Sequence, residues 1–141
     1  MQTINIVTII DVLGALSKGS LQNNIYMVDN SWNSENQGTS DLVTSCYPGQ
    51  PINWIIHAMD VQTPVLIDSI NFLDKDRQYS VSHGFDAKPV LGTAPHWYTW
   101  SGIVPCYLPA GEYRYSLKLQ MGRGQNSIMY SDAPALNVNL L

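Results

Sequence analysis

The residues with the richest binding chemistry in this chain are aromatic and stand in two loops. Four of them follow a segment rich in glycine and proline: His96, Trp97, Tyr98 and Trp100. The fifth, Trp32, stands in a polar loop among asparagines. Trp and Tyr rings offer flat apolar faces on which a sugar can stack, while Asn, Asp and His can hydrogen-bond its hydroxyls. These five residues are a candidate ligand-binding set. Burial in the core and a subunit interface both stay open as alternatives, because large aromatic residues occur often in each.

Residue types that perform catalysis are present, but their spacing matches none of the common catalytic motifs. The chain has no Gly-x-Ser-x-Gly, no phosphate-binding Gly-rich loop and no His-Glu-x-x-His sequence. Cys106 with His96 is a conceivable nucleophile pair. A packed thiol is the better interpretation of Cys106, because free Cys usually behaves as a small buried hydrophobic residue. We therefore expect no catalytic residues and no enzymatic activity.

The metal-binding residue types are dispersed along the chain. His57, His83 and His96 each fall on a different expected element, so no spacing brings them together as metal ligands. The sequence therefore predicts no metal site and no cofactor. We expect Cys46 and Cys106 to be buried, reduced thiols rather than a disulfide, since a cytoplasmic address keeps thiols reduced.

Composition limits the partners of this chain. Charged residues make up 13% of its 141 residues, against roughly 25% in a typical globular protein. The net charge is −4, so little repulsion keeps copies apart, and self-association into a homo-oligomer such as a dimer is expected. The seven Lys and Arg residues are scattered, which argues against nucleic acid. We see no secretory signal and no segment long enough to span a membrane, and so predict a cytoplasmic protein.

The clearest structural signal is a ten-residue alternation from Glu112 to Met121. Every second residue is apolar, and these residues share one face of a strand: Tyr113, Tyr115, Leu117, Leu119 and Met121. The residues between them are polar and share the other face: Glu112, Arg114, Ser116, Lys118 and Gln120. Period two over this length predicts an antiparallel strand with one buried face. The preceding Leu-Pro-Ala-Gly is typical of a turn. This strand is expected to be central in an all-β domain.

The remainder of the chain reads as further short strands separated by turns rich in Gly and Pro. A helical turn over 11–16, capped by Asp11, follows the first strand. The expected strands cover 4–10, 24–29, 39–47, 52–59, 64–73, 112–121, 127–130 and 135–140, with one short strand and a long loop within 78–95. The aromatic-rich stretch 96–101 is expected to be extended. This pattern predicts a single domain over residues 1–141, an antiparallel β-sandwich of seven to nine strands, immunoglobulin-like or jelly-roll-like.

Three stretches carry a resemblance to a known family. They are the opening Ile-Asn-Ile-Val-Thr-Ile-Ile-Asp at 4–11, the Gln-Gly-Thr-Ser-Asp-Leu at 37–42 that leads to Pro-Gly-Gln-Pro-Ile-Asn-Trp at 48–54, and the Gly-Glu-Tyr-Arg-Tyr at 111–115. In these stretches the chain resembles the bacterial inclusion-body protein family of the PixA/AidA type. The resemblance implies a cytoplasmic β-sandwich that can accumulate as inclusions, and it implies no catalytic residues.

Two functional hypotheses follow. The first is a non-catalytic, self-associating bacterial protein of the inclusion-body type, with a second copy of itself as partner. The alternative is a lectin-like module that binds a carbohydrate or another small polar ligand through Trp32, His96, Trp97, Tyr98 and Trp100.

Overall fold

The computed structural model describes residues 2–60, 63–72, 87–90, 99–122 and 127–140. These residues form ten strands and one short helix, and nine of the strands have four residues or more. The elements are β1 (Ile4–Ile10), α1 (Val12–Lys18), β2 (Ile25–Asp29), β3 (Val43–Cys46), β4 (Pro51–Ala58), β5 (Val65–Phe72), β6 (Lys88–Pro89), β7 (Thr99–Ile103), β8 (Gly111–Met121), β9 (Ile128–Ser131) and β10 (Ala135–Val138). The predicted all-β class is confirmed.

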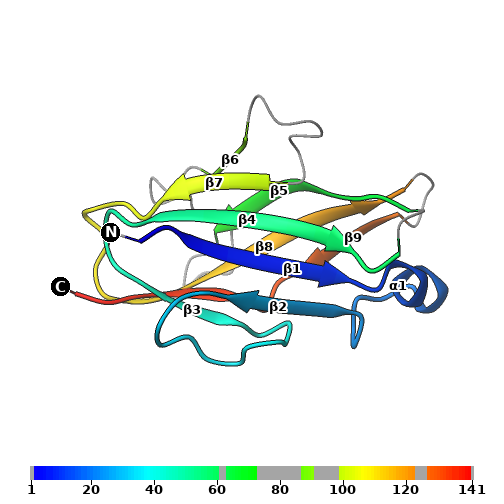
Figure 1. The fold of residues 1–141 in the computed structure, drawn as a ribbon, viewed down its shortest axis with the longest axis horizontal. Helices are drawn as coiled ribbons and strands as arrows, with labels where there is room; N and C mark the ends of the chain where they lie inside the picture. The colour runs from blue at the N-terminus through cyan, green and yellow to red at the C-terminus, as the bar shows by residue number, and fades with distance from the viewer. Residues whose placement is uncertain (1, 61–62, 73–86, 91–98, 123–126, 141) are drawn as a thin grey trace.

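The strands make two sheets that lie one over the other (Figure 1). The first has the order β2-β1-β4-β7-β6, and the second has the order β3-β10-β8-β5, with β9 also paired to β8. Both chain termini lie at one end of the long axis, and α1 lies at the other (Figure 1). The loops β2–β3, β3–β4 and β7–β8 gather at the end that carries the termini (Figure 1).

The sheets are mixed, so the expectation of purely antiparallel pairing is corrected at two places. β1 runs parallel to β4, with Ile6 opposite Trp54, and β10 runs parallel to β3, with Val138 opposite Cys46. Each parallel pair joins strands far apart in the chain, and a long connection permits that arrangement. Alternation of apolar residues identifies a buried face but carries no information about the direction of a neighbouring strand.

The alternation in the sequence does locate the core. In β8 the side chains of Tyr115, Leu117, Leu119 and Met121 are buried, as the period of two predicts. β4 is the middle strand of its sheet and buries Trp54 against β5 and β8. The side chains of both sheets therefore meet in one hydrophobic cluster.

The expected helical turn after β1 is present and is capped at both ends. The Asp11 carboxylate accepts a hydrogen bond from the Gly14 N–H at 3.0 Å, which satisfies a free donor of the first turn. Gly19 ends α1 in the left-handed conformation, with φ of 70°, a conformation that costs a glycine little. The helix thereby closes the end of the sandwich opposite the termini (Figure 1).

Candidate functional site

The five aromatic-loop residues singled out from the sequence do not share one described site. His96, Trp97 and Tyr98 lie outside the described residues. Trp100 is on β7 with 9% of its surface exposed, whereas Trp32 is 71% exposed in the loop between β2 and β3. No contact joins Trp32 to Trp100 among the described residues, and their proposed ligand-binding role stays a prediction.

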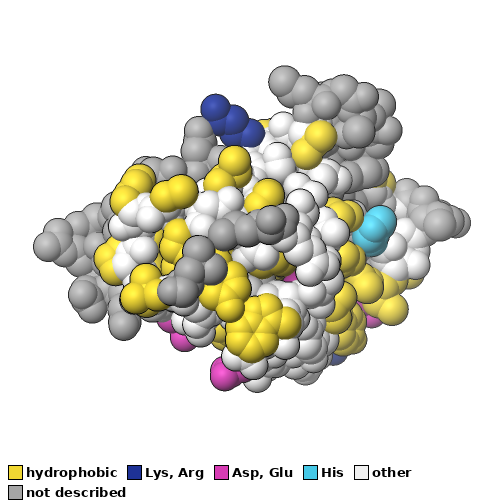
Figure 2. Space-filling view, turned by 60° about the vertical axis from the view of Figure 1, so that its left-hand side comes forward, with side chains coloured by type: hydrophobic (Ala, Val, Ile, Leu, Met, Phe, Trp, Pro, Cys, Tyr) yellow, Lys and Arg dark blue, Asp and Glu magenta, His cyan; other side chains and the backbone are white. Residues whose placement is uncertain are grey.

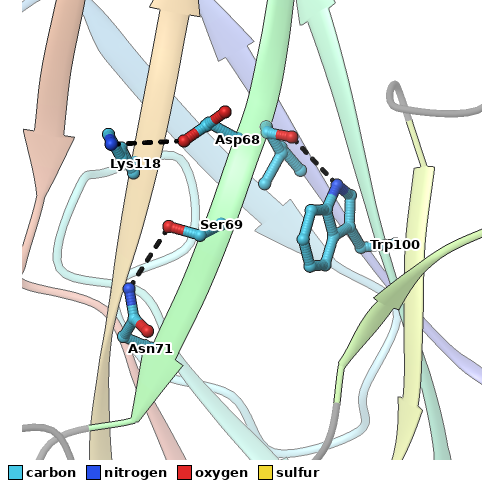
Figure 3. Close-up of polar contacts among 6 residues, drawn as sticks. Asp68, Ser69, Asn71, Trp100 and Lys118 are labelled. Carbon is cyan, nitrogen blue, oxygen red and sulfur yellow. Dashed lines mark hydrogen bonds and ion pairs between the residues drawn. The ribbon is translucent and has the colours of Figure 1, made fainter.

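Trp100 contributes a link between the two sheets. Its indole N–H donates a hydrogen bond of 3.0 Å to the carbonyl oxygen of Ile67 on β5, so its polar atom is already satisfied inside the protein (Figure 3). Beyond this contact, Lys118 forms an ion pair of 3.3 Å with Asp68, and Asn71 donates to Ser69 (Figure 3). The buried indole of Trp100 is positioned to hold β7 against β5.

Trp32 instead presents its ring at the surface. Its indole stacks on the ring of Tyr47, with centroids 6.5 Å apart and planes inclined by 14°. The loop that carries it is fixed to β3, because the Ser31 hydroxyl donates to the Ser45 carbonyl. The Ser31 N–H in turn donates to the Asp29 carboxylate at 2.9 Å. Trp32 is thus an exposed aromatic side chain on an anchored loop.

Further apolar side chains lie exposed at the same end of the sandwich. Ile103 is 61% exposed, Tyr107 70% and Leu140 71%. Backbone hydrogen bonds bring their segments beside Tyr47: Gly49 donates to Val104 at 2.7 Å and Asn139 donates to Cys46 at 2.8 Å. We call the set Trp32, Tyr47, Ile103, Tyr107 and Leu140 the loop-end surface. Figure 2 shows hydrophobic side chains gathered over this end with few charged ones among them.

Sequence reasoning missed most of this surface. Ile103, Tyr107 and Leu140 come from three different segments, and each looks like an ordinary core residue when taken alone. The available signal was position, since all three stand beside predicted turns or at a strand end. Turns are usually exposed at the surface of a domain, so an apolar residue there can escape burial.

The two cysteines differ in environment. Cys46 is buried, and burial raises the pKa of its thiol from 9.0 to about 12. Cys106 is exposed, so the expectation that it is a packed thiol is wrong. It lies in the β7–β8 loop at the loop end, where its sulfur would be 3.5 Å from a Cβ placed on Gly49. Both thiols are free.

The described residues offer little to a catalytic or metal-dependent mechanism. Among them, no group of three or more His, Cys, Asp or Glu side chains is arranged to hold a metal ion. The cavity beside the end of β4, about 250 Å³, includes His57 and Asp60 in its lining, and neither Cys46 nor Cys106 lines it. In the described part of the chain, no helix has the length and apolar character that crossing a membrane requires.

Comparison with known proteins identifies the family. A family model described as "Domain of unknown function (DUF8788)" matches residues 2–127. The chain belongs to the DUF8788 family. No curated protein matches this DUF8788 chain.

The fold of this DUF8788 protein is that of a solved inclusion body protein. It is similar to the crystal structure of the inclusion body protein PixA from Burkholderia cenocepacia, with a TM-score of 0.65 and 12% sequence identity. The match covers 99% of this chain and 95% of the PixA chain. The resemblance noted from the sequence is thereby confirmed at the level of the fold.

Proposed function

We infer that this protein is a non-catalytic, cytoplasmic bacterial protein whose function is self-association, in the manner of an inclusion-body protein. The observation that carries this proposal is the loop-end surface, where large apolar side chains lie exposed on a chain of few charges. Exposed apolar patches of this kind mark interaction sites. The fold shared with an inclusion body protein also favours it.

The environment of Cys46 favours a non-catalytic role. A nucleophilic cysteine acts as the thiolate and needs a lowered pKa, whereas burial raises the pKa of Cys46. Cys106 is exposed in a loop. Cys46 therefore lacks the thiolate character that covalent catalysis requires, while His96, the candidate partner of Cys106, lies outside the described residues.

Sedimentation velocity over a range of protein concentrations tests this function. The mean mass is expected to rise with concentration, and to rise further as the pH approaches the sequence pI of 5.0, because lost net charge removes repulsion. A protein that stays monomeric at millimolar concentration, both at neutral pH and near pH 5.0, contradicts self-association.

Carbohydrate binding is a second candidate, favoured by one observation. Trp32 is 71% exposed and parallel to Tyr47, and such a flat apolar platform suits sugar stacking. Titration of monosaccharides and short oligosaccharides while following Trp fluorescence is the test. A saturable change that disappears in Trp32→Ser supports a binding module, and an unchanged spectrum with every sugar opposes it.

A further inference from the structure

The outer edges of β2 and β3 are both occupied by the loop that joins them. Along β2, the Gly38 N–H donates to the Met27 carbonyl at 2.7 Å, and the Gln37 side chain hydrogen-bonds the Asp29 backbone. Along β3, the Glu35 and Val43 backbones exchange two hydrogen bonds of 3.0 Å. Residues 31–39 therefore seal one edge of each sheet against strand addition.

The strands at the other edges carry features that oppose pairing. β6 is only two residues long and consists of Lys88 and Pro89, and a short strand with Lys and Pro is a poor template for another chain. β5 has a register shift between Ile67 and Ser69 that places Asp68 in a bulge. A bulge bends the strand and interrupts its ladder. Association through the edges of β2, β3, β5 and β6 is thus disfavoured.

The loop-end surface has the composition of an interface core. Two of its five side chains are exposed Trp and Tyr, a third is the Tyr47 ring beneath Trp32, and none is charged. Aromatic enrichment and charge depletion distinguish the buried centre of protein interfaces. From the exposed fractions, its side chains present on the order of 500 Å² of apolar surface per copy.

This area fits a second copy of the same chain. A stable interface buries about 800 Å² on each partner, including a polar rim, and polar loop residues such as Asn30, Asn33 and Ser34 border Trp32 in the chain. The loop-end surface has no charged side chain, so two copies that meet there bring no like charges together at the centre of the interface. The negative net charge of each copy therefore does not oppose contact at that centre. Two-fold symmetric contacts are the commonest form of such self-pairing.

We propose that the loop-end surfaces of two copies pack against each other about a two-fold axis, and that the edges of β2, β3, β5 and β6 take no part. This proposal rests on the proposed self-association. In this arrangement the two Cys106 thiols, exposed at the same end, come within reach of a short bifunctional maleimide. Trp32 and Tyr107 are expected to contribute most of the interface energy, because exposed aromatic anchors dominate interfaces of this type.

Cross-linking through Cys106 tests the two-fold arrangement. The wild-type chain, at a concentration where sedimentation shows association, is expected to give a covalent dimer with a short bismaleimide. Cys106→Ser is expected to give none, since Cys46 is buried. Association without any cross-link overturns the loop-to-loop packing.

Matched variants at the two ends test the surface itself. The loop-end variant carries Trp32→Ser and Tyr107→Ser, and the control carries Leu13→Ser and Met59→Ser, which are 65% and 61% exposed at the helix end. We expect the loop-end variant to weaken dimerisation at least tenfold and the control to leave it within about twofold. Equal association of both variants overturns the proposed surface while leaving self-association standing; a monomeric wild type overturns the function itself. Leu140→Ser, near the described C-terminal end of the chain, is the second variant if the double substitution does not fold.

Discussion

The rings of Trp54 and Tyr115 meet edge to face across the two sheets, with centroids 5.8 Å apart and planes inclined at 75°. Phe72 completes the group, 6.2 Å from Trp54 and 5.5 Å from Tyr115. These rings come from β4, β8 and β5, so both layers of the sandwich contribute to the aromatic cluster. Edge-to-face pairs add about 0.5–1.5 kcal/mol beyond the area they bury.

Removal of one ring from this cluster should be costly. Tyr115 is fully buried, and Tyr115→Ala is expected to lower the free energy of unfolding by about 3–5 kcal/mol, since lost burial and a residual cavity both contribute. Urea unfolding measures this change. Tyr130→Ala is the matched control, because Tyr130 is 56% exposed and its truncation should cost about 1 kcal/mol or less. An equal loss of unfolding free energy in both variants contradicts the burial of Tyr115 in the aromatic cluster.

The two thiols should differ in reactivity. Cys106 is exposed and Cys46 is buried, so a thiol reagent such as DTNB should modify one thiol per native chain within minutes. The second should react only after unfolding, because access and thiolate content both control the reaction. Cys106→Ser should remove the fast phase and Cys46→Ala should keep it. Two equally fast thiols in the native wild type are inconsistent with the burial of Cys46.

Alkaline pH should destabilise the fold through Cys46. Burial raises the pKa of its thiol from 9.0 to about 12, so above pH 9 the unfolded chain releases this proton while the folded chain retains it. The stabilisation is complete below pH 9 and is lost as the pH rises toward 12. Burial also raises the pKa of Tyr115 above 10.0, and this adds to the loss above pH 10.

Urea unfolding between pH 8 and 11 separates the two contributions. Cys46→Ala should lower the free energy of unfolding at pH 8. It should also make the fall of that free energy between pH 9 and 10 less steep, because over this range the Cys46 thiol of the unfolded chain releases its proton. Tyr115→Phe should leave the decline from pH 9 to 10 and reduce it above pH 10. If Cys46→Ala leaves the fall of unfolding free energy between pH 9 and 10 unchanged, other groups cause the pH dependence.

In this chain the sequence predicts where strands and the helix lie better than it predicts which strands pair with each other. The alternation in β8 and the helix cap Asp11 are local signals, and they located a strand and a helix correctly. The parallel pairing of β1 with β4 depends on contacts between distant segments, which no local period encodes.

The candidate site shows the same limit at the level of single side chains. The sequence places Trp32 and Trp100 in one candidate binding set, yet Trp32 is exposed in a loop and Trp100, on β7, donates its N–H inside the protein. The exposure of Cys106 likewise depends on how the β7–β8 loop crosses the end of the sandwich. Whether an apolar residue is covered is a property of the assembled loops.

The Asp29 carboxylate is the anchor of the edge-sealing loop, and its removal should both destabilise the protein and open its edges. One oxygen accepts hydrogen bonds from the Ser31 N–H and the Gln37 side chain, each 2.9 Å, and the other accepts from the Thr44 hydroxyl at 2.7 Å. Asp29→Ala should lower the free energy of unfolding by about 1–3 kcal/mol, because three donors lose a charged acceptor.

The freed edges of β2 and β3 should then pair with other chains, since unprotected strand edges template aggregation. Thioflavin T fluorescence during quiescent incubation is expected to rise in Asp29→Ala and not in the wild type. Asp41→Ala is the matched control, because it removes the same charge from an exposed position of the same loop. An equal rise in both variants assigns aggregation to lost charge and contradicts edge sealing by the loop.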